Sequence, residues 1–349
     1  MGLLEETVAK IEKLDQEKMN QAQERLDSLT KPPGSLGKLE EIAVKLAGIT
    51  GELFPKVDHK AHIVMAADHG VVAEGVSAFP QEVTTQMVYN FLNGGAAVNV
   101  LAKQMAAEVT IVDIGVVNEL EAENLVIKKV KAGTDNLAQG SAMSRQEARA
   151  ALEVGIEVGK DLISQGANLI GTGEMGIGNT TASSAILATI TDLSLDEIVG
   201  YGTGIDEAGL KKKKQVITQS LAVNQPQVDD GIDILAKVGG LEIAGMAGVM
   251  LVAAANRVPV IVDGLISGAA ALIAKKLKPQ VTGYLISSHK SVEPGHIKIY
   301  DLLGLKPLLD LDMRLGEGTG AVLSMNLVEA ATKIISDMAT FEEAQIIIE

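Results

Sequence analysis

A glycine-rich stretch, LIGTGEMGIGNTT at 169–181, contains the residue types that hold anionic ligands. Its glycines let the backbone pass close to a ligand, and the helix expected just beyond it would point free amide N–H groups at an anion. Together with the side chains of Asn179, Thr180 and Thr181, this stretch predicts a phosphate-binding loop. The structural alternative is a glycine-rich turn that connects a strand to a helix capped by threonines.

Three of these glycines, Gly171, Gly173 and Gly176, also match the G-x-G-x-x-G spacing of dinucleotide sites. Such a site requires an acidic residue about 20 positions further on, at the end of the next strand. Asp192 and Asp196 lie near that distance, but they follow a helical pattern without an intervening strand. The pattern therefore weakens the interpretation as an NAD-dependent oxidoreductase, which remains an alternative.

A second glycine-rich stretch, LDMRLGEGTGA at 311–321, places Glu317 between two glycines at the start of an expected helix. An acidic residue near a helix N-terminus is electrostatically favoured, and on the residues alone this structural explanation is preferred. The functional alternative is a carboxylate partly desolvated by Met313 and Leu315, and therefore basic enough to accept a proton.

The histidines of SSHKSVEPGH at 287–296 do not predict a metal site. No H-E-x-x-H spacing occurs, and Pro294 and Gly295 are expected to break any helix that would bring His289, Glu293 and His296 to one face. A ligand-binding loop is the preferred interpretation, and we expect no metal and no cofactor.

Two other charged clusters have ordinary explanations. The run Lys211–Lys214 is typical of a solvated helix face, although one of its lysines could turn toward a phosphate. Asp68 and His69 resemble part of a catalytic triad, but the chain has no G-x-S-x-G elbow to supply a nucleophile. Serine-hydrolase chemistry is therefore improbable.

Alternating apolar runs and helical patterns indicate how these residues are positioned. Short apolar runs predict strands at 61–66, 108–114, 125–130, 167–170, 258–262 and 281–287. Strands that alternate with helices predict a Rossmann-like, doubly wound parallel sheet of about six strands. Ligands of such sheets bind beyond the carboxyl ends of the strands, so we expect a site at that edge, lined by Asp68, Asp113, Glu174 and Asp263.

Helical spacing and capping residues predict the helices between these strands. The expected helices span 4–29, 35–49, 81–105, 145–165, 194–199, 207–223, 239–256 and 265–277, followed by one after the loop at 311–321 and a final segment to the C-terminus. Ser144 is expected to cap the helix at 145–165. The two N-terminal helices carry no strand signal between them, so we place them outside the main sheet.

Composition restricts the class of protein. The 349 residues carry a net charge of −15, which argues against binding to nucleic acids or to anionic membrane surfaces. The chain has no cysteine, which excludes disulfides and thiolate catalysis and fits the cytoplasm. The longest apolar run, at 243–255, is shorter than the roughly 20 residues that span a bilayer, so we expect a soluble protein.

Several stretches together resemble the nicotinate-nucleotide–dimethylbenzimidazole phosphoribosyltransferase family of the cobalamin lower-ligand pathway. The resemblance runs from about residue 28 to about residue 335 and is far more specific than either glycine pattern alone. The stretches are KPPGSLGKLE at 31–40, AADHGVVAEGVSAFPQEVT at 66–84, GTGEMGIGNTTASSAI at 171–186, GTGIDEAGL at 202–210, VDGLISGAAAL at 262–272, SSHKSVEPGH at 287–296 and LDMRLGEGTGA at 311–321.

The resemblance implies that nicotinate mononucleotide and 5,6-dimethylbenzimidazole react to give α-ribazole 5′-phosphate and nicotinate. It also implies a cytoplasmic homodimer without a cofactor. Each chain would have a large Rossmann-like domain at 56–304 and a small helical domain built from residues 1–55 and 305–349. A non-catalytic nucleotide-binding protein remains a further alternative.

The resemblance also implies roles for individual residues. Glu317 would be the general base, and Glu174 a second catalytic carboxylate. Spacing from Gly209 and Leu210 favours Lys213 as the lysine that meets the phosphate. The nucleotide would be held by Gly173, Gly176, Ile177, Gly178, Asn179, Thr180, Gly202, Gly204, Lys213 and Ser291. The benzimidazole would contact Ser77, Phe79, Gln86, Met175 and Leu315.

Overall fold

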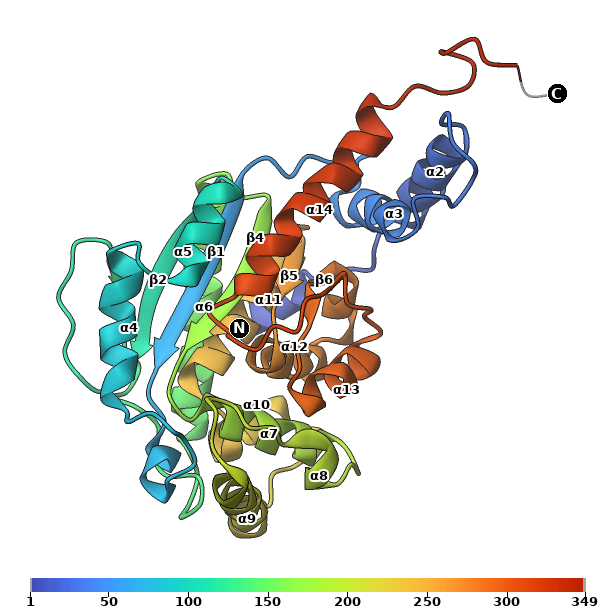
Figure 1. Cartoon of the computed structure of the whole chain (residues 1–349). Helices are drawn as coiled ribbons and strands as arrows, with labels where there is room; N and C mark the ends of the chain where they lie inside the picture. Colours follow the sequence, from blue (N-terminus) through green and yellow to red (C-terminus); the bar gives the residue numbers. More distant parts are fainter. Residues whose placement is uncertain (1, 348–349) are drawn as a thin grey trace.

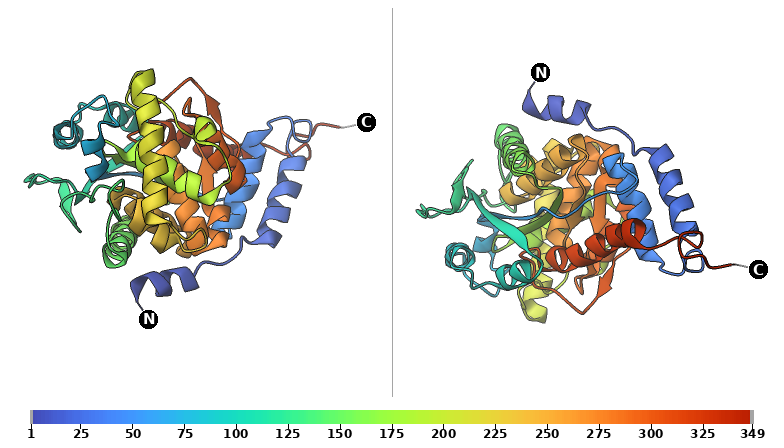
Figure 2. Two further views of the ribbon diagram at one scale, coloured as in Figure 1. Left: turned by 90° about the horizontal axis from the view of Figure 1, so that it is seen from below. Right: turned by 90° about the horizontal axis from the view of Figure 1, so that it is seen from above.

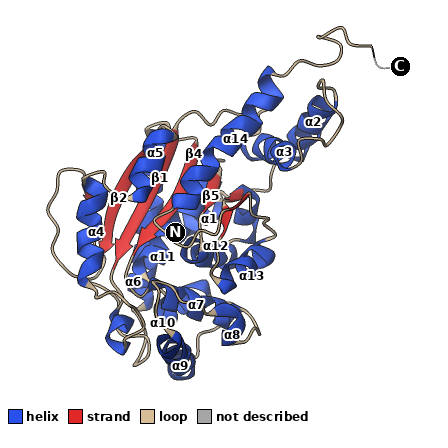
Figure 3. Ribbon diagram, viewed as in Figure 1, coloured by secondary structure: helices blue, strands red, loops and turns tan. Residues whose placement is uncertain are grey.

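Six parallel strands form the central sheet in the order β3-β2-β1-β4-β5-β6 (Figures 1 and 3). The structure, a computed structural model, describes residues 2–347. The strands are β1 (Lys60–Ala67), β2 (Ala107–Gly115), β3 (Leu125–Ile127), β4 (Leu169–Met175), β5 (Val260–Val262) and β6 (Leu285–Ser287). The predicted parallel sheet of about six strands is therefore confirmed.

The strand order reverses between β1 and β4, which lie side by side in the middle of the sheet. Their register pairs Lys60 with Leu169 and Ala66 with Met175, so the two strands end close together. Ligands of open α/β sheets bind beyond the carboxyl ends of the strands at such a reversal. The fold therefore points to the loops after β1 and β4.

Helices cover both faces of the sheet (Figure 1). One face packs against α6 (Arg145–Ser164), α11 (Leu241–Ala255) and α12 (Leu265–Leu277). The other face packs against α4 (Glu82–Leu92), α5 (Ala97–Gln104) and α14 (Thr319–Asp337). Helices on both faces of a parallel sheet make the fold doubly wound, as predicted.

Two N-terminal helices pack against the C-terminal helix at one side of the molecule (Figures 1 and 2). Here α2 (Gln16–Asp27) and α3 (Lys38–Thr50) contact α14, whereas α1 (Leu3–Ala9) packs against α6 and α11. The apolar cluster of α2, α3 and α14 also includes Leu169, Ile261 and Ile286 of the sheet. The domain boundaries near residues 55 and 305 stay predictions.

Two of the predicted helices are each divided into two. The predicted helix at 4–29 is wrong, because Ile11 is buried in an irregular segment and Asp15 begins α2 as its N-cap. The predicted helix at 81–105 is wrong because the Asn-Gly-Gly sequence at 93–95 ends α4, with Gly94 in the left-handed conformation at φ +74°. Asp15 is a local start signal and Gly94 a local stop signal, and the prediction from apolar spacing disregarded both.

Three other expectations also need correction. The glycine-rich turn predicted from residue 171 begins later, because β4 continues through Gly173 to Met175. Pro294 does not break a helix but begins α13 (Pro294–Leu303), at the position where proline needs no hydrogen-bond partner. No helix forms in the described residues beyond α14, where turns follow a bridge between Leu29 and Thr340.

The remaining elements largely follow the prediction. However, the strand predicted at 281–287 forms only over Leu285–Ser287, because the residues before it make a 3-10 turn, and the strand predicted at 125–130 ends at Ile127. Ser144 caps α6 through a reciprocal pair of hydrogen bonds with Glu147. The other helices are α7 (Asn179–Ile190), α8 (Leu195–Ile198), α9 (Glu207–Asn224) and α10 (Gly231–Val238), of which α10 was not predicted. Short elements complete the fold: η1 (Gly70–Glu74), η2 (Pro279–Tyr284), β7 (His289–Lys290) and β8 (Leu309–Asp310). Between residues 2 and 347, no helix is long and apolar enough to cross a membrane.

Candidate active site

A cavity of about 580 Å³ lies at the carboxyl ends of β4 and β5. Its walls come from α4, the loop between β4 and α7, the loop at 202–203, the residues after β5, the segment at 289–293 and the loop at 314–317. These segments lie far apart in the sequence, and most of them follow strands or begin helices. The position is the one expected for a ligand site in this fold.

Eleven of the predicted site residues line this cavity. They are Phe79, Glu174, Met175, Gly176, Ile177, Asn179, Thr180, Gly202, Ser291, Leu315 and Glu317. The fold thus brings together residues predicted to act on the nucleotide, on the benzimidazole and in catalysis. Their individual roles stay predictions.

Glu317 reaches the cavity from the loop before α14, and its side chain is 7% exposed. One carboxylate oxygen accepts a hydrogen bond of 3.1 Å from the backbone N–H of Val98, in the first turn of α5. Burial raises the pKa of Glu317, the Val98 N–H lowers it, and the nearby Asp263 raises it further. A carboxyl group with a raised pKa at a ligand cavity is suited to accept a proton.

The backbone around Glu317 is unusual. Glu317 has φ +61°, and its neighbours Gly316 and Gly318 both have φ +88°. Glycine adopts the left-handed conformation without penalty, but glutamate does not, and strain of this kind costs about 1–3 kcal/mol. Surrounding contacts must therefore hold the loop in place.

Glu174, the last residue but one of β4, is buried and lines the cavity. Asn179 donates a hydrogen bond to its carboxylate. Burial, together with the charges of Glu242 and Asp263, raises the pKa of Glu174 to about 8. At neutral pH this carboxyl group is therefore protonated and can donate a hydrogen bond.

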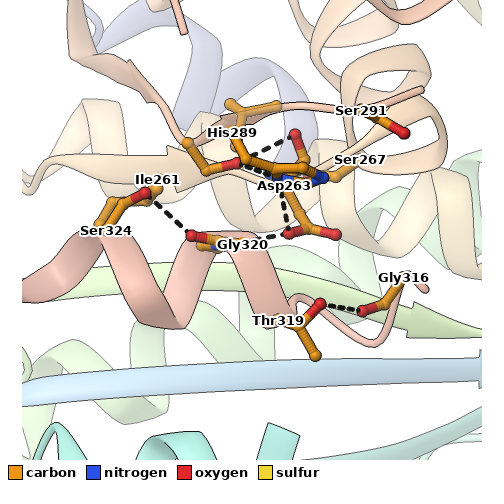
Figure 4. Close-up of polar contacts among 12 residues, drawn as sticks. Ile261, Asp263, Ser267, His289, Ser291, Gly316, Thr319, Gly320 and Ser324 are labelled. Carbon is orange, nitrogen blue, oxygen red and sulfur yellow. Dashed lines mark hydrogen bonds and ion pairs between the residues drawn. The ribbon is translucent and has the colours of Figure 1, made fainter. Parts of the chain in front are cut away.

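Asp263, which follows β5, lies between His289 and the first turn of α14 (Figure 4). One of its oxygens accepts a hydrogen bond of 3.0 Å from Ala321 N and lies 3.8 Å from Nδ1 of His289. Burial raises the pKa of Asp263. The sequence pattern placed Asp263 at this edge of the sheet, but His289 was singled out only as a member of a rejected metal cluster.

Lys213 is the inward-facing member of its lysine run, with 1% of its surface exposed. Its ammonium group donates hydrogen bonds to Thr180 Oγ1 at 2.8 Å and to the carbonyl of Gly200 at 3.4 Å. It therefore lies directly behind Thr180 and Gly202, which line the cavity. Burial lowers the pKa of Lys213 to about 8, although the charge of Glu293 opposes this shift.

Apolar side chains form another part of the wall: Phe79, Val83, Met87, Met175, Ile177 and Leu315. Phe79 and Leu315 are half exposed, and no hydrogen-bonding group of their own orients a ligand there. Val83 and Met87 were not predicted. They are four residues apart on α4 and therefore face the same side, a spacing that could have identified them.

Six predicted residues do not line the cavity: Ser77, Gln86, Gly173, Gly178, Gly204 and Lys213. Gln86 is exposed on α4, next to Met87, and Gly204 borders a neighbouring hollow. Ser77 Oγ lies 3.2 Å from Oγ1 of Thr203, a lining residue. Gly178 is the N-cap of α7, with φ +96°.

Gly173 lies in β4, beneath the loop that carries Glu317. A Cβ atom here would overlap the carbonyl oxygen of Glu317 and would come within 2.6 Å of Nε2 of His62. The absence of a side chain at Gly173 therefore lets the backbone of the Glu317 loop approach β4 closely.

No group of three or more His, Cys, Asp or Glu side chains is arranged to hold a metal ion within residues 2–347. His289 and His296 do come together, with ring centroids 5.8 Å apart. However, Nδ1 of His296 accepts a hydrogen bond from the backbone of Ser291, which occupies one of its two nitrogens.

Comparisons with known proteins agree with this arrangement. A family model described as phosphoribosyltransferase matches residues 11–346. The chain is 56% identical over 345 residues to the nicotinate-nucleotide–dimethylbenzimidazole phosphoribosyltransferase of Chloroflexus aggregans, covering 99% of this chain and 98% of that protein. It is 55% identical to the enzyme of the same name from Alkaliphilus metalliredigens, over the full length of both. The chain belongs to this phosphoribosyltransferase family.

A solved structure extends the similarity to three dimensions. The crystal structure of the phosphoribosyltransferase of the same name from Thermus thermophilus matches with a TM-score of 0.92 and 47% identity, covering 96% of this chain and all of that one. Membership of the phosphoribosyltransferase family removes the oxidoreductase alternative. The G-x-G-x-x-G spacing is misleading because Gly171 and Gly173 lie inside β4 and not in the turn before a helix.

Proposed function

We propose that this phosphoribosyltransferase moves the 5-phosphoribosyl group of nicotinate mononucleotide to 5,6-dimethylbenzimidazole, giving α-ribazole 5′-phosphate and nicotinate. The observation that carries the proposal is Glu317, a buried carboxylate that lies in one cavity with apolar side chains and with Thr180, whose hydroxyl is backed by the ammonium group of Lys213. Such a cavity suits a flat apolar acceptor, an anionic donor and a proton to be removed. The relatives named above carry the same activity in their names.

The donor phosphate would lie against the start of α7. Because Thr180 Oγ1 accepts a hydrogen bond from Lys213, its own proton is free to point to a ligand. The N-terminal amides of α7 and the ammonium group of Lys213 add positive potential. Gly202, whose N–H is held by Glu293 at 2.9 Å, completes this part of the wall.

The acceptor ring would lie against the apolar wall that includes Phe79, Met87 and Leu315. This wall is aliphatic apart from Phe79, so it selects for flatness and size more than for particular polar atoms. The dimethylbenzimidazole N–H must then face Glu317, because that carboxylate is the proton acceptor.

In the chemical step, one ring nitrogen of dimethylbenzimidazole attacks C1′ of the ribose while the bond from C1′ to nicotinate breaks. The bonding electrons leave with the nicotinate ring nitrogen, which loses its positive charge. Glu317 takes the proton from the other benzimidazole nitrogen. Attack opposite the leaving group inverts C1′, which converts a β-linked donor to an α-linked product. Holding both rings on opposite sides of one carbon supplies much of the remaining rate enhancement.

We also propose that the protein acts as a cytoplasmic homodimer. The absence of cysteine fits a reducing compartment, and the family resemblance implies the dimer. Sedimentation of the purified protein at several concentrations would test the dimer directly, because a monomeric mass throughout would contradict it.

The experiment that tests the function incubates the protein with both substrates and follows nicotinate and α-ribazole 5′-phosphate by chromatography. A protein that binds nicotinate mononucleotide without releasing nicotinate would be a binding protein, and the proposal would fail. Glu317→Gln is expected to lower kcat by about 10²- to 10⁴-fold, the usual contribution of a general base, with little change in KM.

The matched control is Glu119→Gln, which removes the charge of a carboxylate that is 88% exposed and outside the cavity. It should leave kcat unchanged. Equal turnover by Glu317→Gln and the control would remove Glu317 from the mechanism while leaving the transfer reaction itself intact.

A further inference from the structure

His62 lies in β1 at 0% exposure, directly beneath the loop that carries Glu317. Its Nε2 is 2.9 Å from the carbonyl oxygen of Glu317. Because a carbonyl oxygen only accepts, Nε2 must carry the proton and donate it. The other ring nitrogen, Nδ1, is buried and has no partner among the described residues.

Glycines surround the His62 ring and leave the space that it occupies. Cβ atoms at Gly171 or Gly173 of β4 would come within 2.7 Å of its nitrogens. A Cβ atom at Gly318 would overlap its Cε1. Three glycines from two separate segments thus leave room for this one ring, and together they bring the strand, the ring and the catalytic loop into contact.

Stability alone does not explain this histidine. Burying an imidazole with one nitrogen unpartnered has a desolvation cost that an apolar side chain would avoid. Within residues 2–347, the single hydrogen bond that the ring makes is to the backbone of Glu317, a residue in the strained left-handed conformation. Burial lowers the pKa of His62 to about 4, so the ring stays neutral and keeps this one donor over the working pH range.

We propose that His62 is a positioning residue for the transfer reaction, which holds the Glu317 loop in its catalytic conformation through the Nε2–H to carbonyl hydrogen bond. The carbonyl is held by His62 and one carboxylate oxygen by Val98 N–H, so both ends of Glu317 are fixed. Glu317 lines the cavity, and its other carboxylate oxygen accepts no hydrogen bond from the described residues. The inference rests on the proposed role of Glu317 as the general base.

The test compares His62→Leu with His62→Gln. Leucine fills similar space without a donor, whereas the glutamine amide nitrogen reaches about as far as Nε2. We expect His62→Leu to lower kcat by about 10- to 100-fold, because a misplaced catalytic group can cost up to about 10²-fold, with KM changed by less than about twofold. His62→Gln should restore kcat to within about fivefold of the wild type.

A double variant separates positioning from general damage to the fold. In a Glu317→Gln background the group being positioned is already absent, so adding His62→Leu should lower kcat by less than about threefold. Similar losses in both backgrounds would overturn the proposal, as would a His62→Leu enzyme with wild-type kcat or a His62→Gln enzyme as slow as His62→Leu.

If His62→Leu does not fold, His62→Asn takes its place. Its amide nitrogen corresponds to Nδ1 and is too short to reach Glu317, so it should be slow where His62→Gln is fast. Failure of the proposal is distinct from failure of the function. Wild-type protein that releases no nicotinate would refute the transfer reaction, and full activity in Glu317→Gln alone would refute the base.

Discussion

Replacing Lys213 by methionine should weaken nicotinate mononucleotide binding and, at the same time, stabilise the fold. The fall in the pKa of Lys213 from its usual 10.5 to about 8 means that the folded protein disfavours the charged ammonium group. At about 1.4 kcal/mol for each pH unit, this corresponds to about 3 kcal/mol of lost stability at pH 7.

Methionine removes that penalty and fills similar space. The hydrogen bonds of Lys213 to Thr180 and Gly200 disappear, which costs about 1 kcal/mol or slightly more. The net expectation at pH 7 is a gain of about 1–2 kcal/mol in the free energy of unfolding. Removing a charge that would meet the phosphate should raise KM for nicotinate mononucleotide by about 10- to 100-fold, with KM for dimethylbenzimidazole changed by less than about twofold.

The sign of the pH dependence provides a second check. Between pH 8 and 10.5 the unfolded chain binds more protons at this lysine than the folded protein does, so wild-type stability from this group rises with pH. The stability advantage of Lys213→Met should therefore shrink as the pH rises from 7 to 10. Urea unfolding of both proteins at several pH values, without ligand, measures this difference in the free energy of unfolding.

Lys214→Met is the matched control, because Lys214 is the next residue, is more exposed and pairs with Asp196 at the surface. Lys214→Met should change the free energy of unfolding by less than about 0.5 kcal/mol, and it should leave both KM values unchanged. A Lys213→Met protein that is less stable than the wild type at pH 7 would contradict the burial penalty, and equal binding of nicotinate mononucleotide by the two lysine variants would contradict the phosphate role of Lys213.

Two further predictions concern β4. The pKa of Glu174 is raised to about 8, so this residue contributes stability that is complete below pH 4.5 and lost as the pH rises through 8. Urea unfolding of Glu174→Gln should therefore show a smaller decline in the free energy of unfolding between pH 5 and 9 than the wild type shows. An unchanged decline would contradict the raised pKa. Gly173→Ala should lower kcat although Gly173 lies outside the cavity, because the new Cβ atom would displace the carbonyl of Glu317. Gly140→Ala is the control and should leave kcat unchanged, because a Cβ atom there meets open space. Steady-state kinetics of the two variants makes the comparison.

Local signals in the sequence were sufficient for much of the fold. The apolar runs predicted all six strands of the sheet, and Ser144 predicted the start of α6, because the groups that decide these features lie within a few residues of one another. The errors came where local signals competed. Helical spacing continued through Asn93–Gly95, although the left-handed Gly94 ends α4 there.

The carboxyl edge of the sheet was predictable in the same way. Asp263 and Glu174 stand at or just after the ends of apolar runs, and parallel strands bring their ends to one edge. Lys213 was chosen from the family resemblance, although helical spacing also separates it from the other lysines: it lies three residues before Val216 and four before Ile217, on the buried face of α9.

The sequence by itself therefore determined the parallel sheet, the edge at which a ligand binds and the family to which the chain belongs. Only the tertiary structure decided what Gly171 and Gly173 do. In the sequence they form part of a nucleotide-binding pattern, but in the fold they make room for His62 and for the carbonyl of Glu317. The physical reason is that a glycine in a sequence indicates at most a close approach of another group. Here that group is the His62 ring of a separate strand and the Glu317 carbonyl of a distant loop, which only the fold brings near.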